Sequence, residues 1–132
     1  MNTLDMTTKD IGQRGENAAV RFLRRRFYRI VARNYVAGKY EIDIIAETFR
    51  HIVFVEVKTR TQDPKNIGMY GSPSVAVTHK KRAFVVAAAR RYLAWHKCDK
   101  EPRFDVIEVY LSPDKTSKIL KLQHMKDAYR AY

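Results

Sequence analysis

The sequence predicts an α/β domain, a mixed central sheet of about five strands flanked by helices. The pattern of apolar residues switches from a helix-like to a strand-like period in the order helix, three strands, helix, two strands. The chain has 132 residues, 45% of them hydrophobic, which suits one domain with one core. We therefore expect a single domain over residues 1–132, with flexible ends at about 1–9 and 130–132.

The first half of the chain predicts one helix followed by a meander. Residues 10–27 form the helix, because apolar and small residues recur there at steps of three and four. Strands are expected at 28–35, 41–45 and 53–58, where β-branched and aromatic residues are frequent and apolar residues alternate with polar ones. The short connections favour three antiparallel strands.

The second half predicts a long loop, a helix and two strands. The loop covers 59–78, and its length is typical of functional or mobile segments. A helix over 79–96 then leads to strands at 104–111 and 118–122, and the tail at 125–132 is expected to form a helical turn. A right-handed crossover through this helix makes the third and fourth strands parallel.

The charge of the chain favours a polyanionic partner. Lys and Arg number 26 against 14 Asp and Glu, giving a formal net charge of +12 and an isoelectric point near 10.0. Phosphate contacts release condensed counterions, so nucleic acid is the leading partner. Acidic membrane surfaces, acidic proteins and a basic surface without a partner are the alternatives.

Other features bear on the compartment. Cys98 is the only cysteine, which excludes an internal disulfide and fits a reducing environment. The first residues contain no apolar signal region, and no apolar run reaches the length of a membrane span. We expect a cytoplasmic protein.

The central hairpin predicts a pair of opposed acids. If Glu47 pairs near Ile52, the antiparallel register places Asp43 opposite Glu56. The same alternation puts Glu41 and Lys58 on that face and the apolar residues Ile42, Ile44, Val55 and Val57 on the other, as core.

Opposed carboxylates repel, so something must offset Asp43 against Glu56. A divalent cation with a preference for oxygen ligands, Mg²⁺ or Mn²⁺, would do so, and Lys58 would stabilise developing negative charge beside it. This arrangement suits metal-assisted hydrolysis of a phosphodiester. The alternative is an ordinary outward strand face, with Glu41 and Lys58 as a cross-strand ion pair.

Glu16 is a candidate fourth member of the site. It lies at the edge of the apolar stripe of the first helix, where a carboxylate must be paired or bind something. Gly12 and Gly15 allow that helix to approach the sheet closely. The alternative is that Glu16 reaches solvent or bonds an arginine.

These residues resemble the YraN family of bacterial proteins, which are mostly uncharacterised. The resemblance covers most of the chain, and the motifs that carry it are the helix segment GQRGENA at 12–18, RNY at 33–35, EID at 41–43, FVEVKTR at 54–60, YGSP at 70–73, AVT at 76–78 with Lys81, RFDV at 103–106 and KDAY at 126–129. Tyr40 stands where the family commonly has glycine before Glu-Ile-Asp.

The resemblance implies a restriction-endonuclease-like fold of the PD-(D/E)xK nucleases, with archaeal Holliday-junction resolvases as similar characterised proteins. Asp43 then matches the first acid of the motif, Glu56 the second and Lys58 the lysine, while Glu16 matches the helical glutamate that some members add to the metal site. The resemblance favours DNA over RNA as the partner, and a homodimer is compatible with it. A shared fold does not establish activity.

Basic residues near the proposed site are candidates for nucleic-acid contacts. Three of them cluster at the start of the second helix, where a phosphate would offset their repulsion by the helix dipole. The candidates are Lys39, Arg60, Lys80, Lys81 and Arg82, with Lys65 and Tyr70 in the long loop as further ones. The alternative is a solvated helix end.

Two functions follow from these patterns. The first is a metal-dependent endonuclease that cuts branched or single-stranded DNA with Mg²⁺ or Mn²⁺. The second is a nucleic-acid-binding module that keeps the nuclease fold without turnover.

Overall fold

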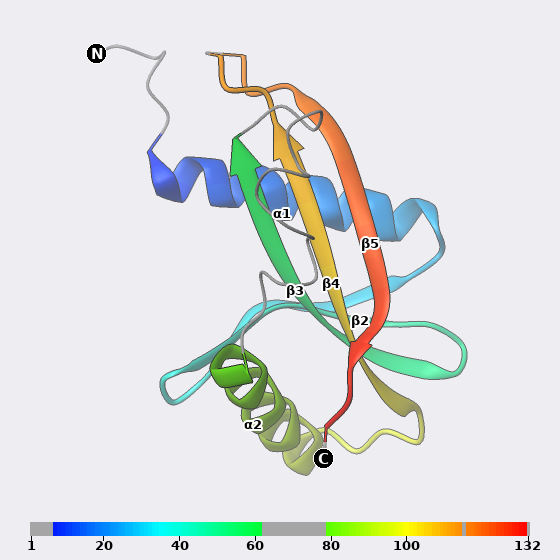
Figure 1. Ribbon diagram of the computed structural model, residues 1–132. Helices are drawn as coiled ribbons and strands as arrows, with labels where there is room; N and C mark the ends of the chain where they lie inside the picture. Colours follow the sequence, from blue (N-terminus) through cyan, green and yellow to red (C-terminus); the bar gives the residue numbers. More distant parts are fainter. Residues whose placement is uncertain (1–6, 62–78, 115, 132) are drawn as a thin grey trace.

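A five-stranded mixed sheet with one helix on each face forms the core of the molecule, as the sequence predicted (Figure 1). The computed structural model describes residues 7–61, 79–114 and 116–131. The strands lie side by side in chain order, β1 (Arg29–Ala37), β2 (Tyr40–Glu47), β3 (His51–Thr61), β4 (Glu101–Leu111) and β5 (Ile119–Tyr129).

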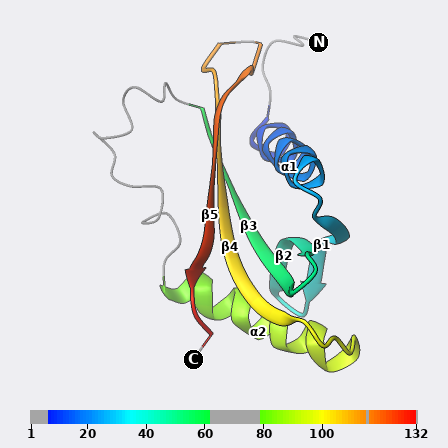
Figure 2. The same ribbon diagram turned by 90° about the vertical axis from the view of Figure 1, so that its right-hand side faces the viewer.

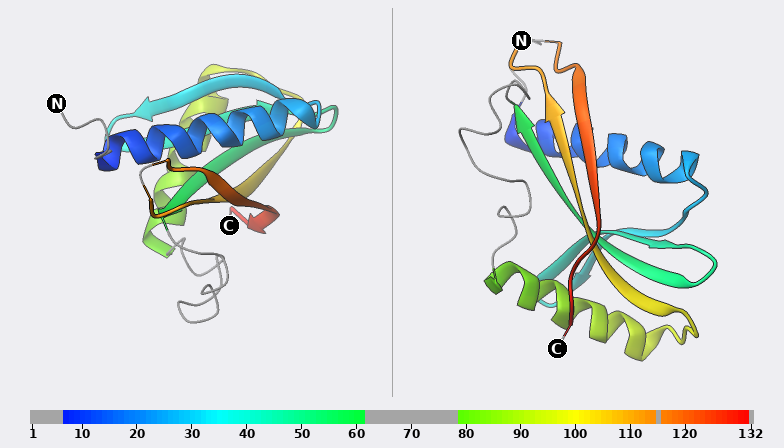
Figure 3. Two further views of the ribbon diagram at one scale, coloured as in Figure 1. Left: turned by 90° about the horizontal axis from the view of Figure 1, so that it is seen from above. Right: turned by 45° about the vertical axis from the view of Figure 1, so that its right-hand side comes forward.

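The strand pairings confirm the predicted topology. Antiparallel ladders join β1 to β2, β2 to β3 and β4 to β5. Strands β3 and β4 are parallel, and α2 (His79–Trp95) lies in the crossover between them. Both helices are visible on their separate sides of the sheet in Figures 2 and 3.

The first helix, α1 (Thr8–Arg25), begins two residues earlier than the pattern predicted. Its start is fixed by a capping box, in which the Asp10 amide donates to Thr7 Oγ1 at 3.1 Å and the Thr7 amide donates to Asp10 Oδ2 at 3.2 Å. Gly15 then brings the helix against β3, because a Cβ atom added there would lie 1.9 Å from Thr59 Oγ1. The close approach that the glycines suggested therefore occurs at Gly15.

The core is divided between the two faces of the sheet. The α1 face buries Ala19 and Leu23 against Ile44, Val55 and other strand residues. On the α2 face, apolar side chains of the helix pack against those of the strands. The helix contributes Val85, Ala88, Ala89 and Tyr92, and the strands contribute Ile42, Ile45, Phe54 and Phe104. The expectation that Ile42, Ile44 and Val55 belong to the core is confirmed, but these residues do not share one face, because Ile42 packs with the α2 cluster and the other two with the α1 cluster.

The C-terminal end also differs from its prediction. A helical turn was expected at 125–132, but β5 continues to Tyr129. Its polar residues broke the alternation that marks a strand, and an edge strand tolerates them. The buried Asp105 also holds this part of β5, because its carboxylate accepts the Asp127 amide at 2.9 Å.

Part of the predicted loop falls inside β3, which runs to Thr61, and the rest lies outside the described residues together with Lys65 and Tyr70. In the described part of the chain, neither helix is both long enough and apolar enough to cross a membrane.

Candidate functional site

Asp43 lies where β2 separates from β3. The predicted register is confirmed, since Ile45 pairs with Phe54 and Glu47 with Ile52, but the ladder ends at Ile44 and Val55. Beyond that end, the Val57 amide donates to Asp43 Oδ2 at 2.8 Å. A half-buried amide without a strand partner needs an acceptor. The Asp43 side chain therefore closes the hairpin where its backbone pairing stops.

Glu56 is the more deeply buried acid of the two, with 4% of its surface exposed. Its Oε1 atom lies 3.6 Å from Lys81 Nζ of α2. Within the described residues, its Oε2 atom has no hydrogen-bond partner. A buried carboxylate oxygen without a donor is costly, so this atom favours a cation or a proton.

Both acids are buried in a way that disfavours their ionisation. Burial raises the pKa of Glu56 to about 7, and the nearby charge of Asp43 acts in the same direction. Burial also raises the pKa of Asp43, against the lowering effects of the Val57 amide and Lys81. Coupled carboxylates with raised pKa values are typical of sites that hold a proton or a cation between them.

Lys58 lies on β3 two residues after Glu56, on the same side of the strand. Burial, Asp43 and Lys81 have larger effects on the pKa of Glu56, and the charge of Lys58 lowers that pKa further. The structure records no ion pair between Lys58 and the exposed Glu41 among the described residues, which removes the cross-strand pair that was the simpler alternative. The position of Lys58 beside the acids agrees with its predicted place.

An acid that the sequence did not single out faces Lys58 from β4. Glu108 is 1% exposed and pairs in register with Lys58. Its Oε1 atom accepts from Arg60 Nε and, at 2.9 Å, from the Tyr110 hydroxyl, which leaves Oε2 without a partner in the described residues. The available signal was an acid inside the apolar run 106–111. Arg60, predicted to contact nucleic acid, is thus engaged by a buried carboxylate.

Glu16 faces the same cavity as Asp43. The cavity has a volume of about 480 Å³ and lies between the start of α1 and the open end of the β2–β3 hairpin. Glu16 Oε1 accepts from Arg33 Nε at 3.0 Å and from Asn34 Nδ2 at 3.2 Å. The helix therefore carries Glu16 toward the site, where it bonds an arginine, as the alternative interpretation held.

The acids do not form a compact cage. Across residues 7–61, 79–114 and 116–131, no group of three or more His, Cys, Asp and Glu side chains is arranged to hold a metal ion. The structure brings Asp43 and Glu56 together, and Glu16 lines the cavity beside Asp43 while its Oε1 atom is bonded to Arg33 and Asn34.

The basic residues predicted to contact nucleic acid lie in different environments. Lys81 lies against Glu56. Lys39 and Lys80 are exposed beside the rings of Tyr40 and Phe84, at 5.9 and 5.8 Å. Arg82 lies over the Tyr129 ring at 5.1 Å from its centroid.

Comparison with known sequences agrees with this arrangement of motifs. The model of the uncharacterised protein family UPF0102 matches residues 15–109, which include Glu16, Asp43, Glu56 and Lys58. The chain belongs to this family. UPF0102 is the YraN family that the sequence motifs indicated.

Relatives in UPF0102 match nearly the whole chain. A UPF0102 protein of Porphyromonas gingivalis is 39% identical over 91% of this chain and 84% of its own length. One from Caldanaerobacter subterraneus is 39% identical over 92% and 95%, and one from Chlorobium phaeobacteroides is 42% identical over 92% and 94%.

Proposed function

We propose that this UPF0102 protein is a metal-dependent phosphodiesterase that acts on nucleic acid, as an endonuclease for branched or single-stranded DNA. The observation that carries the proposal is the buried pair of Asp43 and Glu56, with raised pKa values and an unpartnered Glu56 oxygen. Such a pair is stable in its ionised form only next to additional positive charge.

The donor set fits Mg²⁺ or Mn²⁺. Both ions prefer carboxylate oxygens and are commonly held by one or two acids, with water completing the coordination. Asp43 and Glu56 would be the direct ligands, and Glu16 would act through the shared cavity. A bound cation supplies positive charge to the phosphate and acidifies a water.

The protein residues have separate tasks in this proposal. The Val57 amide fixes one oxygen of Asp43, which keeps that carboxylate oriented toward Glu56. Lys81 of α2 supplies positive charge to Glu56 at 3.6 Å. Lys58 is placed to stabilise negative charge that develops on the scissile phosphate.

A cleavage assay tests the proposal. Wild-type protein and the variants Asp43→Asn, Glu56→Gln and Lys58→Met are incubated with labelled single strands, flaps, four-way junctions and duplexes in Mg²⁺, Mn²⁺ or a chelator. We expect metal-dependent cutting of branched or single-stranded DNA, reduced at least about a hundredfold in each variant. Glu101→Gln, a change on a largely exposed strand residue, is the matched control. Cleavage by Asp43→Asn at the wild-type rate contradicts the proposal.

A second candidate is a nucleic-acid-binding module without turnover. It is favoured by Lys81 and Arg33, which already provide positive charge at Glu56 and Glu16. Calorimetric titration with Mn²⁺ separates the two candidates. The phosphodiesterase binds Mn²⁺ and loses it in Asp43→Asn, whereas the binding module takes up none, with or without DNA.

A further inference from the structure

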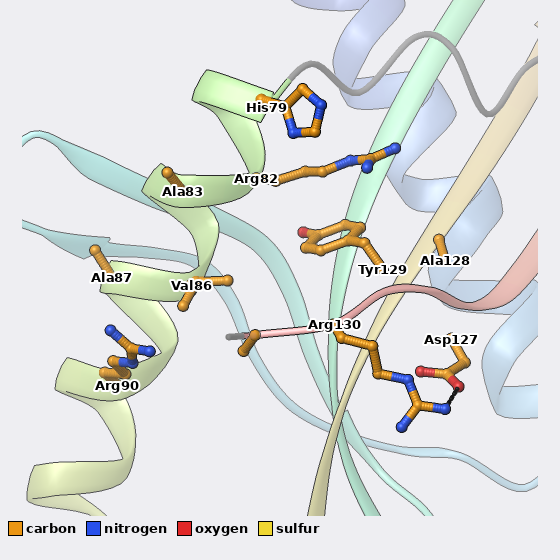
Figure 4. Close-up of a pocket in the computed structure, with 11 residues that line it drawn as sticks. His79, Arg82, Ala83, Val86, Ala87, Arg90, Asp127, Ala128, Tyr129 and Arg130 are labelled. Atoms are coloured by element: carbon orange, nitrogen blue, oxygen red, sulfur yellow. Dashed lines mark ion pairs between the residues drawn. The ribbon is translucent and has the colours of Figure 1, made fainter.

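A basic groove runs between α2 and the end of β5, beside the acid pair. It has a volume of about 650 Å³, which lies in the range of ligand sites. Figure 4 shows its two walls, with His79, Arg82 and Arg90 on the helix and Tyr129 and Arg130 on the C-terminal segment.

Positive charge dominates this groove. It is lined by three arginines and one histidine, and its only acid is Asp127. That acid is already paired, because Arg130 Nη2 lies 2.8 Å from Asp127 Oδ2. Within the described residues, Arg82 and Arg90 form no ion pair. The groove therefore presents uncompensated cations to an anionic ligand.

The two helix arginines are spaced for an extended ligand. Arg82 and Arg90 are eight residues apart on α2, which puts them on the same side of the helix and about 12 Å apart along its axis. Between them lie small or apolar residues, Ala83, Val86 and Ala87, which leave the floor open. A ligand that bridges both cations must therefore carry negative charge at more than one place along its length.

Hydrogen-bond donors at the inner end lack acceptors. The Arg82 guanidinium lies over the Tyr129 ring, 5.1 Å from its centroid, as Figure 4 shows. In the part of the chain that the structure describes, both Arg82 Nε and the buried Tyr129 hydroxyl have no hydrogen-bond partner. An anion at this end would correct a shortage of acceptors.

The groove also adjoins the acid pair. Lys81, the residue before Arg82, lies 3.6 Å from Glu56 Oε1. The charge of Glu56 also reaches the inner end of the groove, because it adds to the effect of burial in raising the pKa of the Tyr129 hydroxyl.

We propose that this groove binds the sugar–phosphate backbone of a single DNA strand, next to the phosphate that Asp43 and Glu56 would hold. The phosphates lie at Arg82 and toward Arg90 and Arg130, which contact no base and so read no sequence. The position of the scissile phosphate rests on the proposed function, while the groove itself requires no cutting.

Binding of a labelled single-stranded DNA, followed by fluorescence anisotropy in a chelator, tests the groove. The variant Arg90→Glu is compared with Arg91→Glu, which makes the same charge change on the next, exposed residue outside the groove. We expect Arg90→Glu to weaken binding about tenfold and to lower the salt slope by about 0.7, as for one lost phosphate contact. Arg91→Glu should stay within about threefold of wild type.

The outcomes separate this inference from the proposed function. Equal losses of affinity in the two variants, or no DNA binding by the wild type, would overturn the proposed binding site. If the protein cuts DNA and the two variants lose equal affinity, the proposed phosphodiesterase stands and the groove is ruled out. If the protein never cuts DNA and only Arg90→Glu loses affinity, the groove stands and the phosphodiesterase is ruled out. An RNA strand of the same sequence forms the second arm. A loss confined to RNA overturns DNA as the ligand.

Discussion

Glu56 is a buried acid whose charge is only partly compensated by the residues around it. Its carboxylate is buried, one oxygen faces Lys81 and the other has no partner in the described residues. Burial and Asp43 raise its pKa to about 7. Because the folded state holds a proton that the unfolded chain releases near pH 4.5, ionisation of Glu56 opposes folding.

Replacing Glu56 should therefore change how stability depends on pH. In wild type, the contribution of Glu56 to the free energy of unfolding falls as pH rises from 4.5 to about 7. Glu56→Gln mimics the protonated form, so we expect it to be more stable than wild type above pH 7 by about 1–3 kcal/mol, and equal to it below pH 4.5. Urea unfolding across this window measures both.

The matched control for this experiment is Glu101→Gln, on a side chain that is 74% exposed. It should keep the wild-type profile, because an exposed carboxylate is similarly solvated in both states. If Glu56→Gln also keeps the wild-type profile, Glu56 is not a buried ionisable group in solution.

The sequence predicted which residues form the acid pair, but it did not predict the side chains that surround them. The acids Asp43 and Glu56 and the neighbouring Lys58 followed from alternation and register, both of which are local properties. The partners Lys81, Glu108 and Arg33 come from other elements, and nothing in the hairpin specifies them. For this reason Glu16 was correctly placed near the site, while its bond to Arg33 was left as one of two alternatives.

At the scale of elements, the contact between α1 and β3 is set by one glycine. A Cβ atom on Gly15 would lie 1.9 Å from Thr59 Oγ1 and 2.8 Å from Thr59 Cβ. Such distances require the helix or the strand to shift. At Gly12, by contrast, an added Cβ has nothing within 4 Å.

The same substitution at these two glycines should have opposite effects. Gly12→Ala gains helix propensity without a clash, and we expect it to stabilise the protein by about 0.5–1 kcal/mol. Gly15→Ala gains the same propensity but forces the helix away from Thr59, at a net cost of about 1–3 kcal/mol. Thermal or urea unfolding of both variants measures the difference, and Thr59→Ala should partly restore Gly15→Ala.

A second link between elements is the buried network at Asp105, which the sequence did not reveal. Its carboxylate accepts from Arg103 Nε at 2.9 Å, from His124 Nε2 at 2.7 Å and from the Asp127 amide. Burial opposes ionisation, but the hydrogen bonds from His124 and Arg103 prevail and lower the pKa of Asp105. The network therefore joins β4 to β5 through a charged acid.

Removing that charge should loosen β5. Asp105→Asn leaves Arg103 and His124 without an anion, and we expect a loss of about 3–5 kcal/mol near neutral pH. A lowered pKa contributes stability above the unfolded value of 3.8 and loses it as pH falls further, so the deficit should shrink in acid. Chemical unfolding measures the loss, with Asp99→Asn at an exposed position as the control. Equal losses of stability in the two variants would contradict the prediction.

The element order was predictable because each helix and strand carries its own period. The ends of β5 were not, since the strand is held by a buried acid of β4 and its own sequence lacks alternation. The helices that flank the sheet were predicted, but the strand residues that each helix covers were not. Ile45 and Phe54 belong to the face that also carries Glu56, and only the crossing of α2 decides where that face is covered.

At the scale of the molecule, the +12 charge is unevenly spread, and α2 carries five Lys and Arg residues without any Asp or Glu. The described structure separates it into cations that face acids, such as Arg60, Arg103 and Lys81, and cations that do not, such as Arg82 and Arg90. Only the second group can release counterions from DNA without breaking an ion pair. The net charge alone therefore overstates the number of phosphate contacts.

The salt dependence of DNA binding should reflect this smaller number. For the phosphates at Arg82, Arg90 and Arg130 on a single strand, the slope of log affinity against log salt is about −2. A slope near −8, as the whole net charge would give, would mean that the ion-paired cations also bind phosphate. Anisotropy titrations at a series of salt concentrations in chelator measure the slope, with a duplex of the same sequence for comparison.

The bond between the Val57 amide and Asp43 has a consequence for how the acid pair is observed. The proton on that nitrogen is held by a carboxylate 2.8 Å away, so its magnetic resonance frequency depends on the charge of that carboxylate. One backbone signal thus reports protonation of the pair and arrival of a cation, without any substrate. Its rate of exchange with deuterated water would show how often the hairpin opens at this end.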